Sequence, residues 1–422
     1  MHAARAITGR RGKGMADELL DGVTSDPVHM GWMQGFPPPA EKVLLAARAD
    51  HMRFPMIRWS YSNMRQFVPS RRVGASGEGQ RFERALREDL ARVSFVPLGD
   101  EVPLTFEQSL TRAFTDGIIV LHRGKVVFER WFGVTGPETR HIAFSVTKSF
   151  VGTIAEMLVE EGRLDPAAPV AEYLPELGSS GFGDASVQQV MHMTTALDFS
   201  EDYADPNSGI GAYSAALGLT PRAADYAGPT DLATYLPSIG KAGHHGKGFT
   251  YRTPNTEVLA WIIARLEGRH FADVLSERLW QPLGMLGDAD LIVDQAGMAF
   301  AGGGLNLRLE DLARFGESMR LGGLGIIPER VIERIRRGGD PVDFDPNRYP
   351  QLPGWSYGSQ WWHAHNNRGC FSARGIHGQT LWVDPEAEMT IARFASHPIA
   401  ANGANDPLSL PAWEAVAHAL KC

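Results

Sequence analysis

Ser145 and Lys148 stand three residues apart in the segment "HIAFSVTKSF". On a helix, side chains at positions i and i+3 share one face, with Cβ atoms about 5–6 Å apart, so this hydroxyl and this amine can share a hydrogen bond. The serine would then be a nucleophile, and the lysine would be its base if burial lowers the lysine pKa. A helix N-terminus would also stabilise the developing alkoxide through its dipole and free N–H groups. A capped helix start without catalysis would contain the same two residues, so the rest of the chain has to distinguish the two interpretations.

A second serine–lysine pair of the same spacing shows how weak the motif is by itself. Ser238 and Lys241 stand in "SIGK", with Pro237 before the serine and Gly240 inside the motif. Proline and glycine disfavour a helix interior, so no stable helix is expected to hold these two side chains together. Ser145 differs because a predicted strand hairpin precedes it and a predicted amphipathic helix follows it.

A hydrolase of this kind also needs a proton relay to the leaving group and donors for the oxyanion. Tyr251 in "FTYRTPNTEVLAW" is a candidate relay, with Asn255 one turn further on. The commoner alternative for a single tyrosine is a buried ring whose hydroxyl is hydrogen-bonded. In "SARGIHGQTLW", Gly375 allows a close backbone approach and the N–H of Ile376 could point at a substrate carbonyl, although a strand with a bulge would have the same sequence.

Histidines and a cysteine offer a different kind of site, a metal centre. The candidate ligands are His363, His365, Cys370 and His377, with His244 and His245 elsewhere. Zinc sites prefer other ligand spacings, and the sequence has no HExxH motif. It also has no GxSxG elbow, no Walker loop and no GxGxxG motif followed by an acidic residue. We therefore expect neither a metal nor an organic cofactor.

The elements that must position these residues can be located from their patterns. Residues 117–133, "GIIVLHRGKVVFERWFG", predict a hairpin that turns at Gly124. After Ser145, apolar residues at helical spacing predict a helix that ends at Gly162. The segment "TPNTEVLAWIIARLEG" predicts a helix opened by its proline and closed by its last glycine. Later, "ARGIHGQTLWVDPEAEMTIARFAS" predicts a hairpin that turns at "DPEAE", and "PAWEAVAHALKC" predicts a short C-terminal helix.

Early and late strands with helices between them predict an α/β fold of the α+β type. It would be an antiparallel sheet flanked by helices, with an inserted, mainly helical region and the active site in the cleft between them. We expect the sheet from about residues 115–135 and 355–400, and the helical region from about 165–350. Residues 1–100 are irregular but contain several aromatic residues, so we expect an N-terminal extension packed on the core, followed by one domain over 101–422 that contains the Ser145 site.

Composition excludes several classes of protein. The 422 residues are 43% hydrophobic and 21% charged, as is typical of a soluble globular protein. The formal net charge of −8 argues against a nucleic-acid partner, and no apolar run is long enough to span a membrane. The N-terminal "MHAARAITGRRGKGMADELL" lacks the apolar core of a secretory signal, so we expect a cytoplasmic protein. Its native start could be Met1 or Met15.

Together, these motifs resemble those of the serine β-lactamase and penicillin-binding-protein superfamily. Within it, the chain is most similar to the 6-aminohexanoate-dimer hydrolases and related carboxylesterases. The similar stretches cover about residues 110–400 and include "FSVTKSFVGTIAEMLVEEGRLDPAAPVAEYLPEL", "EDYADP", "YRTPNTEVLAWIIARLEG", "QWW" and "GIHGQTLWVDP". The resemblance implies a β-lactamase/DD-peptidase-like fold and a cofactor-free serine hydrolase that cleaves a small amide or ester through an acyl-enzyme.

The resemblance also implies roles for individual residues. Ser145 would be the nucleophile, Lys148 its base and Tyr251 the proton relay. The N–H groups of Ser145 and Ile376 would form the oxyanion hole. Tyr203 would lie over the acyl site and bind the substrate amide. The residues that would complete the substrate pocket are Trp362, as a wall, and Ser214, Asn255, Gly375 and His377.

Two positions depart from the family pattern. β-Lactamases have a Lys-Thr-Gly triplet that pairs with the substrate carboxylate, whereas this chain has Ala373-Arg374-Gly375. The 6-aminohexanoate-dimer hydrolases have an acidic residue for the substrate ammonium, whereas this chain has Ser214. We therefore expect short, uncharged acyl groups, and faster cleavage of esters than of amides. A β-lactamase or D-Ala-D-Ala peptidase and a non-catalytic ligand-binding relative are the alternatives, and the sequence leaves a homodimer open.

Overall fold

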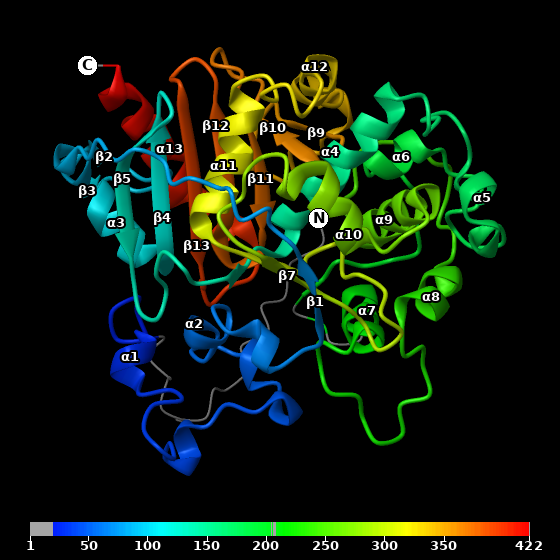
Figure 1. Cartoon of the computed structure of the whole chain (residues 1–422), viewed down its shortest axis with the longest axis horizontal. Coiled ribbons are helices and arrows are strands. Elements are labelled where there is room, and N and C mark those ends of the chain that lie inside the picture. The colour runs from blue at the N-terminus through cyan, green and yellow to red at the C-terminus, as the bar shows by residue number, and fades with distance from the viewer. Residues whose placement is uncertain (1–19, 204, 206–207, 422) are drawn as a thin grey trace, which may run out of the picture.

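A seven-stranded antiparallel sheet forms the centre of the molecule (Figure 1). The computed structural model describes residues 20–203, 205 and 208–421. The strand order is β5-β4-β13-β12-β11-β10-β9, so early strands of the chain pair with late ones. These strands are β4 (Thr115–His122), β5 (Lys125–Trp131), β9 (Ser356–Gly358), β10 (Trp361–His363), β11 (Phe371–Gly375), β12 (Gln379–Asp384) and β13 (Met389–Ala395). The predicted α+β fold class is confirmed.

Helices cover both faces of this sheet and form much of the region between its early and late strands (Figure 1). Helix α4 packs against both α9 and α12 beside the sheet. The α-helices of the described chain are α1 (Pro27–Met30), α2 (Ile57–Ser60), α3 (Phe106–Arg112), α4 (Thr147–Glu160), α5 (Val170–Tyr173), α6 (Val187–Met191), α7 (Gly209–Leu217), α8 (Leu232–Tyr235), α9 (Pro254–Glu267), α10 (Phe271–Leu275), α11 (Leu309–Arg320), α12 (Glu329–Arg337) and α13 (Asp406–Leu420).

Alternate residues of β4 show that the sheet is buried on both faces, because successive side chains of a strand point to opposite sides. Ile119 and Leu121 belong to the core that also includes residues of α4 and α11. Ile118 and Val120 belong to a second core, which includes residues of α3 and α13. The sheet is therefore the middle layer of three.

Both predicted hairpins are present. Only Arg123 and Gly124 separate the paired ends of β4 and β5, and their φ angles of 52° and 79° are both positive, as a type I′ turn requires. In the second hairpin, Asp384 pairs with Met389, so the chain turns over residues 385–388 between β12 and β13.

The ends of the helices around the serine–lysine segment also agree with the sequence. Helix α4 is followed by Gly162 with a φ of 67°. Helix α9 begins at Pro254 and is capped by Gly268, also with a φ of 67°. The C-terminal helix is longer than predicted: α13 begins at Asp406, whereas the predicted helix begins at Pro411, which lies inside α13.

A second sheet was not predicted. It has the order β1-β7-β8-β6, and its strands β1 and β7 lie below α10 and α11 in Figure 1. Its strands are β1 (Ser70–Val73), β6 (His141–Ile142), β7 (Ala289–Ile292) and β8 (Leu305–Leu307), and a separate pair is β2 (Ser94–Phe95) with β3 (Leu104–Thr105). The region expected to be mainly helical thus contains two strands, each too short to show an alternating pattern.

The N-terminal part of the described chain runs along the body of the molecule (blue in Figure 1). Tyr61 and Val73 have no exposed surface and lie in the core that contains α4 and α9. Strand β1 pairs with β7, which lies over two hundred residues later. Met1 and Met15, the two candidate starts, lie outside the described residues. Over residues 20–203, 205 and 208–421, no helix has the length and apolar character that crossing a membrane requires.

Candidate active site

The segment that carries Ser145 starts as a short 3-10 turn, Phe144–Val146, and continues directly into α4. Phe144 has a φ of +43°, in the left-handed region, which costs a residue with a Cβ atom about 1–3 kcal/mol. Its ring packs against Tyr61 and His377, with ring centroids 4.9 Å and 5.8 Å away. This packing holds the unfavourable turn that places Ser145 at the start of the helix.

Lys148 lies one turn further along and contacts the serine. Its Nζ atom is 2.9 Å from the Oγ atom of Ser145. The same amine donates to the carbonyl oxygen of Gly302 at 2.6 Å and lies 3.2 Å from Oγ1 of Thr253. The structure therefore brings the predicted pair into direct contact.

The environment of Lys148 favours loss of its proton. Only 1% of this residue is exposed. Burial disfavours a charged amine and lowers the pKa of Lys148 to about 8, while the negative charges of Glu201 and Glu257 oppose that effect. A lysine with this pKa has a substantial neutral fraction at mildly alkaline pH, as a general base requires.

Tyr251 approaches the same two groups from the loop before α9. Its ring centroid is 5.1 Å from Nζ of Lys148, and its ring stacks on that of Trp362 at 5.6 Å. Burial raises the pKa of Tyr251 well above its ordinary value, and a hydrogen bond with Ser145 works in the opposite direction. Tyr251 is therefore protonated at neutral pH and placed next to the serine.

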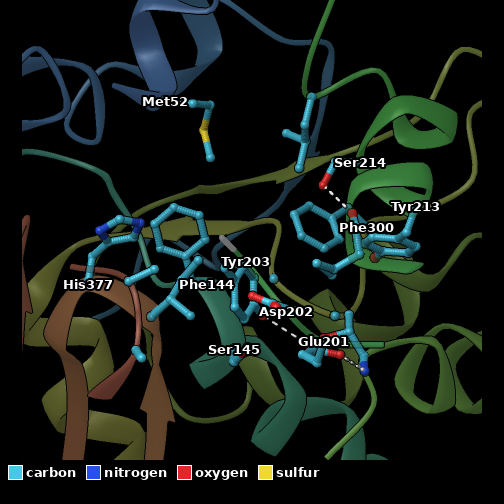
Figure 2. A pocket seen from close by; sticks show the side chains of 18 of the residues that line it. Met52, Phe144, Ser145, Glu201, Asp202, Tyr203, Tyr213, Ser214, Phe300 and His377 are labelled. Atoms are coloured by element: carbon cyan, nitrogen blue, oxygen red, sulfur yellow. Dashed lines mark hydrogen bonds between the residues drawn. The ribbon is translucent and has the colours of Figure 1, made fainter. Parts of the chain in front are cut away.

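Two cavities meet at Ser145 within the described part of the chain. The larger, of about 560 Å³, has apolar walls that include Met52, Phe144 and Phe300 (Figure 2). The smaller, of about 340 Å³, extends past Tyr251. The residues that line both cavities are Ser145, Glu201, Tyr203, Ile376 and Ala401. A substrate bond held over Ser145 would place one half of the substrate in each cavity.

The end of β11, predicted to supply an oxyanion donor, lies beside the serine segment. Ile376 directly follows this strand and lines both cavities. A Cβ atom at Gly375 would lie 2.6 Å from the carbonyl oxygen of Ala143, so this approach of two backbones requires glycine. The close backbone contact suggested by the sequence is present.

Tyr203 and Ser214 line the larger cavity, as predicted (Figure 2). The hydroxyl of Tyr203 donates to Oε1 of Glu201 at 2.7 Å, and 42% of Tyr203 is exposed. The hydroxyl of Ser214, on α7, donates to the carbonyl oxygen of Ile210 at 2.8 Å. Trp362 lines the smaller cavity.

His377 also lines the larger cavity. Its Nδ1 atom is 2.7 Å from the carbonyl oxygen of His397, and burial lowers the pKa of His377 to about 4. The imidazole is therefore neutral at neutral pH, and Nδ1 carries the proton because a carbonyl oxygen can only accept. The Nε2 atom therefore carries no proton and can only accept a hydrogen bond.

Like Gly375, Asn255 is a predicted substrate-binding residue that lines neither cavity. It is fully buried; its Oδ1 atom accepts from the hydroxyl of Thr195 at 2.8 Å, and its Nδ2 atom donates to the carbonyl oxygen of Arg252 at 3.0 Å. Tyr251 lies before α9, so a spacing of four residues does not put the two side chains on one helical face. These hydrogen bonds give Asn255 a structural role, and a contact between Asn255 and the substrate remains a prediction.

The chain matches known proteins over most of its length. A family model described as Beta-lactamase matches residues 105–407. The chain belongs to the beta-lactamase family. A 6-aminohexanoate-dimer hydrolase from Paenarthrobacter ureafaciens is 35% identical to it over 350 residues, which are 82% of this chain and 86% of that protein.

Solved structures agree with this family assignment. A putative 6-aminohexanoate-dimer hydrolase from Bacillus anthracis is 30% identical and superposes with a TM-score of 0.82, covering 91% of this chain and 98% of that one. EstCE1, a hydrolase with promiscuous acyltransferase activity, has a TM-score of 0.57 at 16% identity and covers 74% of this chain and 96% of its own, a likeness in fold alone. The expected fold and the expected hydrolase class are confirmed.

Arg374 is the charged residue of the Ala373-Arg374-Gly375 triplet, which stands where the β-lactamases have Lys-Thr-Gly. It lines the smaller cavity, but it forms an ion pair with Asp406 and only 7% of its side chain is exposed. Its guanidinium also lies over the rings of Trp355 and Trp362, 5.6 Å and 5.3 Å from their centroids. The charge is therefore already paired and covered, which makes Arg374 a poor receptor for a substrate carboxylate.

The structure also separates the alternative motifs from this site. The hydroxyl of Ser238 donates to the carbonyl oxygen of Tyr235 at 2.6 Å, while Lys241 forms an ion pair with Asp184. The second serine–lysine pair is thus bound to other partners, as its proline and glycine suggested. Among the residues that the structure describes, no three His, Cys, Asp or Glu side chains are grouped so that they could hold a metal ion.

Sequence analysis missed several residues at the centre of the site. Glu201 and Thr253 stand within two residues of Tyr203 and Tyr251, inside segments already recognised, so their proximity was a usable signal. Gly302 gives no such signal, since it belongs to a run of glycines far from any motif. Glu201 and its neighbour Asp202 also show that acidic side chains line the larger cavity, although the one expected from the family is replaced by serine.

Proposed function

We propose that this chain is a serine hydrolase that cleaves a small linear amide or ester through an acyl-enzyme. Ser145 is the nucleophile, Lys148 is its base, and Tyr251 passes a proton to the leaving amine or alkoxide. The observation that carries this proposal is the 2.9 Å contact between Nζ of Lys148 and Oγ of Ser145, placed where two cavities meet.

Each half of the reaction uses the same groups. Lys148 takes the hydroxyl proton as Oγ of Ser145 attacks the substrate carbonyl, and the N–H groups of Ser145 and Ile376 stabilise the oxyanion. Tyr251 gives its proton to the leaving group and regains one from Lys148, which returns the amine to its neutral form. Water then attacks the acyl-enzyme by the reverse route and releases the acid and free Ser145.

The two cavities favour an uncharged, linear acyl group and a leaving group that can lie on aromatic rings. Esters should react faster than amides, because an alkoxide leaves more readily than an unprotonated amine. The similarity to 6-aminohexanoate-dimer hydrolases supports linear amides as substrates of the same site. The apolar walls of the larger cavity include Met52, Phe144, Ile210, Leu219 and Phe300.

The two alternatives have less support. A β-lactamase or D-Ala-D-Ala peptidase would need a cation for the substrate carboxylate, and Arg374 is committed to Asp406. A non-catalytic binder would have no use for a buried lysine held against a serine, since burial of an amine is costly without a function for it.

Substrate profiling tests the proposal directly. Purified protein would be assayed with p-nitrophenyl esters of increasing acyl length, with the 6-aminohexanoate dimer and with nitrocefin. We expect hydrolysis of short esters, slower hydrolysis of the dimer and none of nitrocefin. Hydrolysis of nitrocefin alone would support the β-lactamase alternative, and no hydrolysis at all would support the binder.

The rate of ester hydrolysis should rise with pH through a midpoint near 8. The neutral amine of Lys148 is the active form, and burial lowers its pKa to about 8. Below that pH the amine is protonated and cannot accept the serine proton; above it the rate reaches a plateau. The measurement is kcat/KM on p-nitrophenyl acetate from about pH 6 to pH 10. A rate that is constant or falls over this range would contradict the role of Lys148 as base.

Ser214→Asp should raise the hydrolysis of the 6-aminohexanoate dimer. The new carboxylate would line the larger cavity, where a substrate ammonium can reach it. A hydrogen bond to a charged group contributes roughly 1.5–3 kcal/mol, which is about ten- to over a hundredfold in rate if it forms in the transition state. The measurement is kcat/KM on the dimer and on p-nitrophenyl acetate for both proteins.

The neutral ester is the control for Ser214→Asp and should be hydrolysed at nearly the same rate by both proteins. An equal gain on both substrates would show a general effect of the substitution. Efficient dimer hydrolysis by the wild-type chain, unchanged in the variant, would show that Ser214 does not face the substrate ammonium.

A further inference from the structure

The amine of Lys148 has three polar neighbours, and their chemistry limits how it can be oriented. A neutral amine has two N–H bonds and one lone pair, and only the lone pair can accept the proton of Ser145. The carbonyl oxygen of Gly302, 2.6 Å from Nζ, can only accept a hydrogen bond. The hydroxyl groups of Ser145 and Thr253 can each donate or accept. The lone pair therefore faces one of these two hydroxyl groups, and the structure has to select between them.

Glu201 determines, through Thr253, which of the two hydroxyl groups the lone pair of Lys148 faces. The hydroxyl of Thr253 lies 2.6 Å from Oε1 of Glu201, and the N–H of Thr253 donates to Oε2 of the same carboxylate at 2.9 Å. A carboxylate only accepts, so Thr253 must use its single hydroxyl proton there. Towards Lys148 it can then only accept. The second N–H of the amine goes to Thr253, and the lone pair is left facing Ser145.

A second carboxylate fixes the other acceptor. The N–H groups of Ala301 and Gly302 donate to the two oxygen atoms of Glu257 at 3.0 Å and 2.7 Å. Glu257 has no exposed surface and stands on α9, one turn after Thr253. A Cβ atom at residue 302 would lie 2.5 Å from the Cγ2 atom of Thr253, so glycine is needed for this backbone to reach the amine. The carbonyl of Gly302 is thereby aimed at Lys148.

We propose that Glu201 and Thr253 are positioning residues, which turn the lone pair of Lys148 towards Ser145. Glu257 is a third positioning residue, because it holds the carbonyl of Gly302 in place to accept the other N–H of the amine. This inference rests on the proposed function, because it concerns the orientation of the proposed base. Without the acceptor at Glu201, the hydroxyl of Thr253 is free to donate to the lone pair, and the amine then has no acceptor left for the serine proton.

Orientation and charge can be separated by the shape of the pH profile. The charged groups that face Lys148 are Glu201, from the loop before α7, and Glu257, from α9. Loss of either negative charge lowers the pKa of the amine and shifts the midpoint of the rate to lower pH. Loss of a negative charge alone leaves the rate at the high-pH plateau unchanged, because the amine of Lys148 is neutral in every molecule at that pH. Loss of orientation lowers the plateau itself.

The test compares Thr253→Val, which is isosteric but has no hydroxyl, with Thr253→Ser, which retains it. We expect Thr253→Val to lower the plateau kcat on p-nitrophenyl acetate by about 10²-fold, within the range of general-base catalysis, and to change KM little. Labelling by a fluorophosphonate should slow by a similar factor. Thr253→Ser should restore the plateau to near the wild-type value. Unfolding temperatures of all variants verify that each one is folded.

Glu201→Gln provides a second, independent measurement. The amide removes the charge and can present a donor to Thr253, so the midpoint should shift to lower pH and the plateau should fall about tenfold, the loss expected for one hydrogen bond. The matched control is Glu138→Gln, a carboxylate that is 62% exposed and pairs with Arg308 away from the site. It should change neither the midpoint nor the plateau.

The outcomes are distinct. A folded Thr253→Val with the wild-type plateau overturns the inference and leaves the proposed function intact. If Thr253→Val does not fold, Glu201→Gln decides: a lowered plateau supports positioning, and an unchanged plateau, with or without a shifted midpoint, overturns it. A wild-type chain that neither hydrolyses esters nor reacts with the fluorophosphonate overturns the proposed function and this inference together.

Discussion

Replacing Ser145 with alanine should lower kcat on p-nitrophenyl esters by on the order of 10⁶-fold, the loss seen when a serine nucleophile is removed from a hydrolase. It should also abolish covalent labelling by a fluorophosphonate. The alanine cannot form an acyl-enzyme, and the 2.9 Å contact with Nζ of Lys148 disappears with the hydroxyl. The measurements are steady-state kinetics and the mass of the protein after exposure to the fluorophosphonate.

Ser238→Ala is the matched control for this substitution. The serine is replaced in the same way and has the same spacing to a lysine, but its hydroxyl is bonded to the carbonyl oxygen of Tyr235 and lies outside the site. Turnover and labelling should both be unchanged. Labelling that persists in Ser145→Ala would place the nucleophile elsewhere.

Lys148→Arg should lower kcat by at least about 10³-fold, within the range that general acid–base catalysis contributes. A guanidinium does not lose its proton in a protein, so it cannot accept the proton of Ser145. The larger, permanently charged group also enters a site where only 1% of the native residue is exposed. The measurement is kcat at a pH above the midpoint, where the wild-type amine is neutral.

Lys148→Met separates this chemistry from damage to the fold. Methionine is uncharged and similar in length, so the variant should fold and still be inactive, because it has no base. Circular dichroism and unfolding temperature would verify the fold of both variants. Close to full activity in Lys148→Arg would rule out the amine as base.

The parts of the fold that depend on local sequence were predictable. The β4–β5 turn needs two residues with positive φ, and Arg123 and Gly124 are these two residues. The start and end of α9 follow from Pro254 and Gly268. The second sheet was not predictable in this way, because β1, β6, β7 and β8 are two to four residues long and come from three distant parts of the chain.

The same distinction applies to the site. Ser145 and Lys148 were found because they are one helical turn apart. The other partners of the lysine, Thr253 and Gly302, lie 105 and 154 residues further along the chain. No local pattern can specify such contacts, since the packing of α4 against α9 and the loop before β8 creates them. Asn255 illustrates another limit: the resemblance assigns it to the substrate pocket, whereas its side chain bonds to Thr195 and to the carbonyl oxygen of Arg252, contacts that no local pattern specifies.

The N-terminal region bears on how specificity could diverge among relatives. The family match begins at residue 105, yet Met52 lines the larger cavity, and the ring of Tyr61 lies 4.9 Å from that of Phe144 and 5.4 Å from that of His377. A chain trimmed to the matched segment would therefore lose a wall of its substrate cavity and the support of the turn before its serine. Substitutions in this N-terminal region can change substrate specificity without changing any residue of the segment that matches the family.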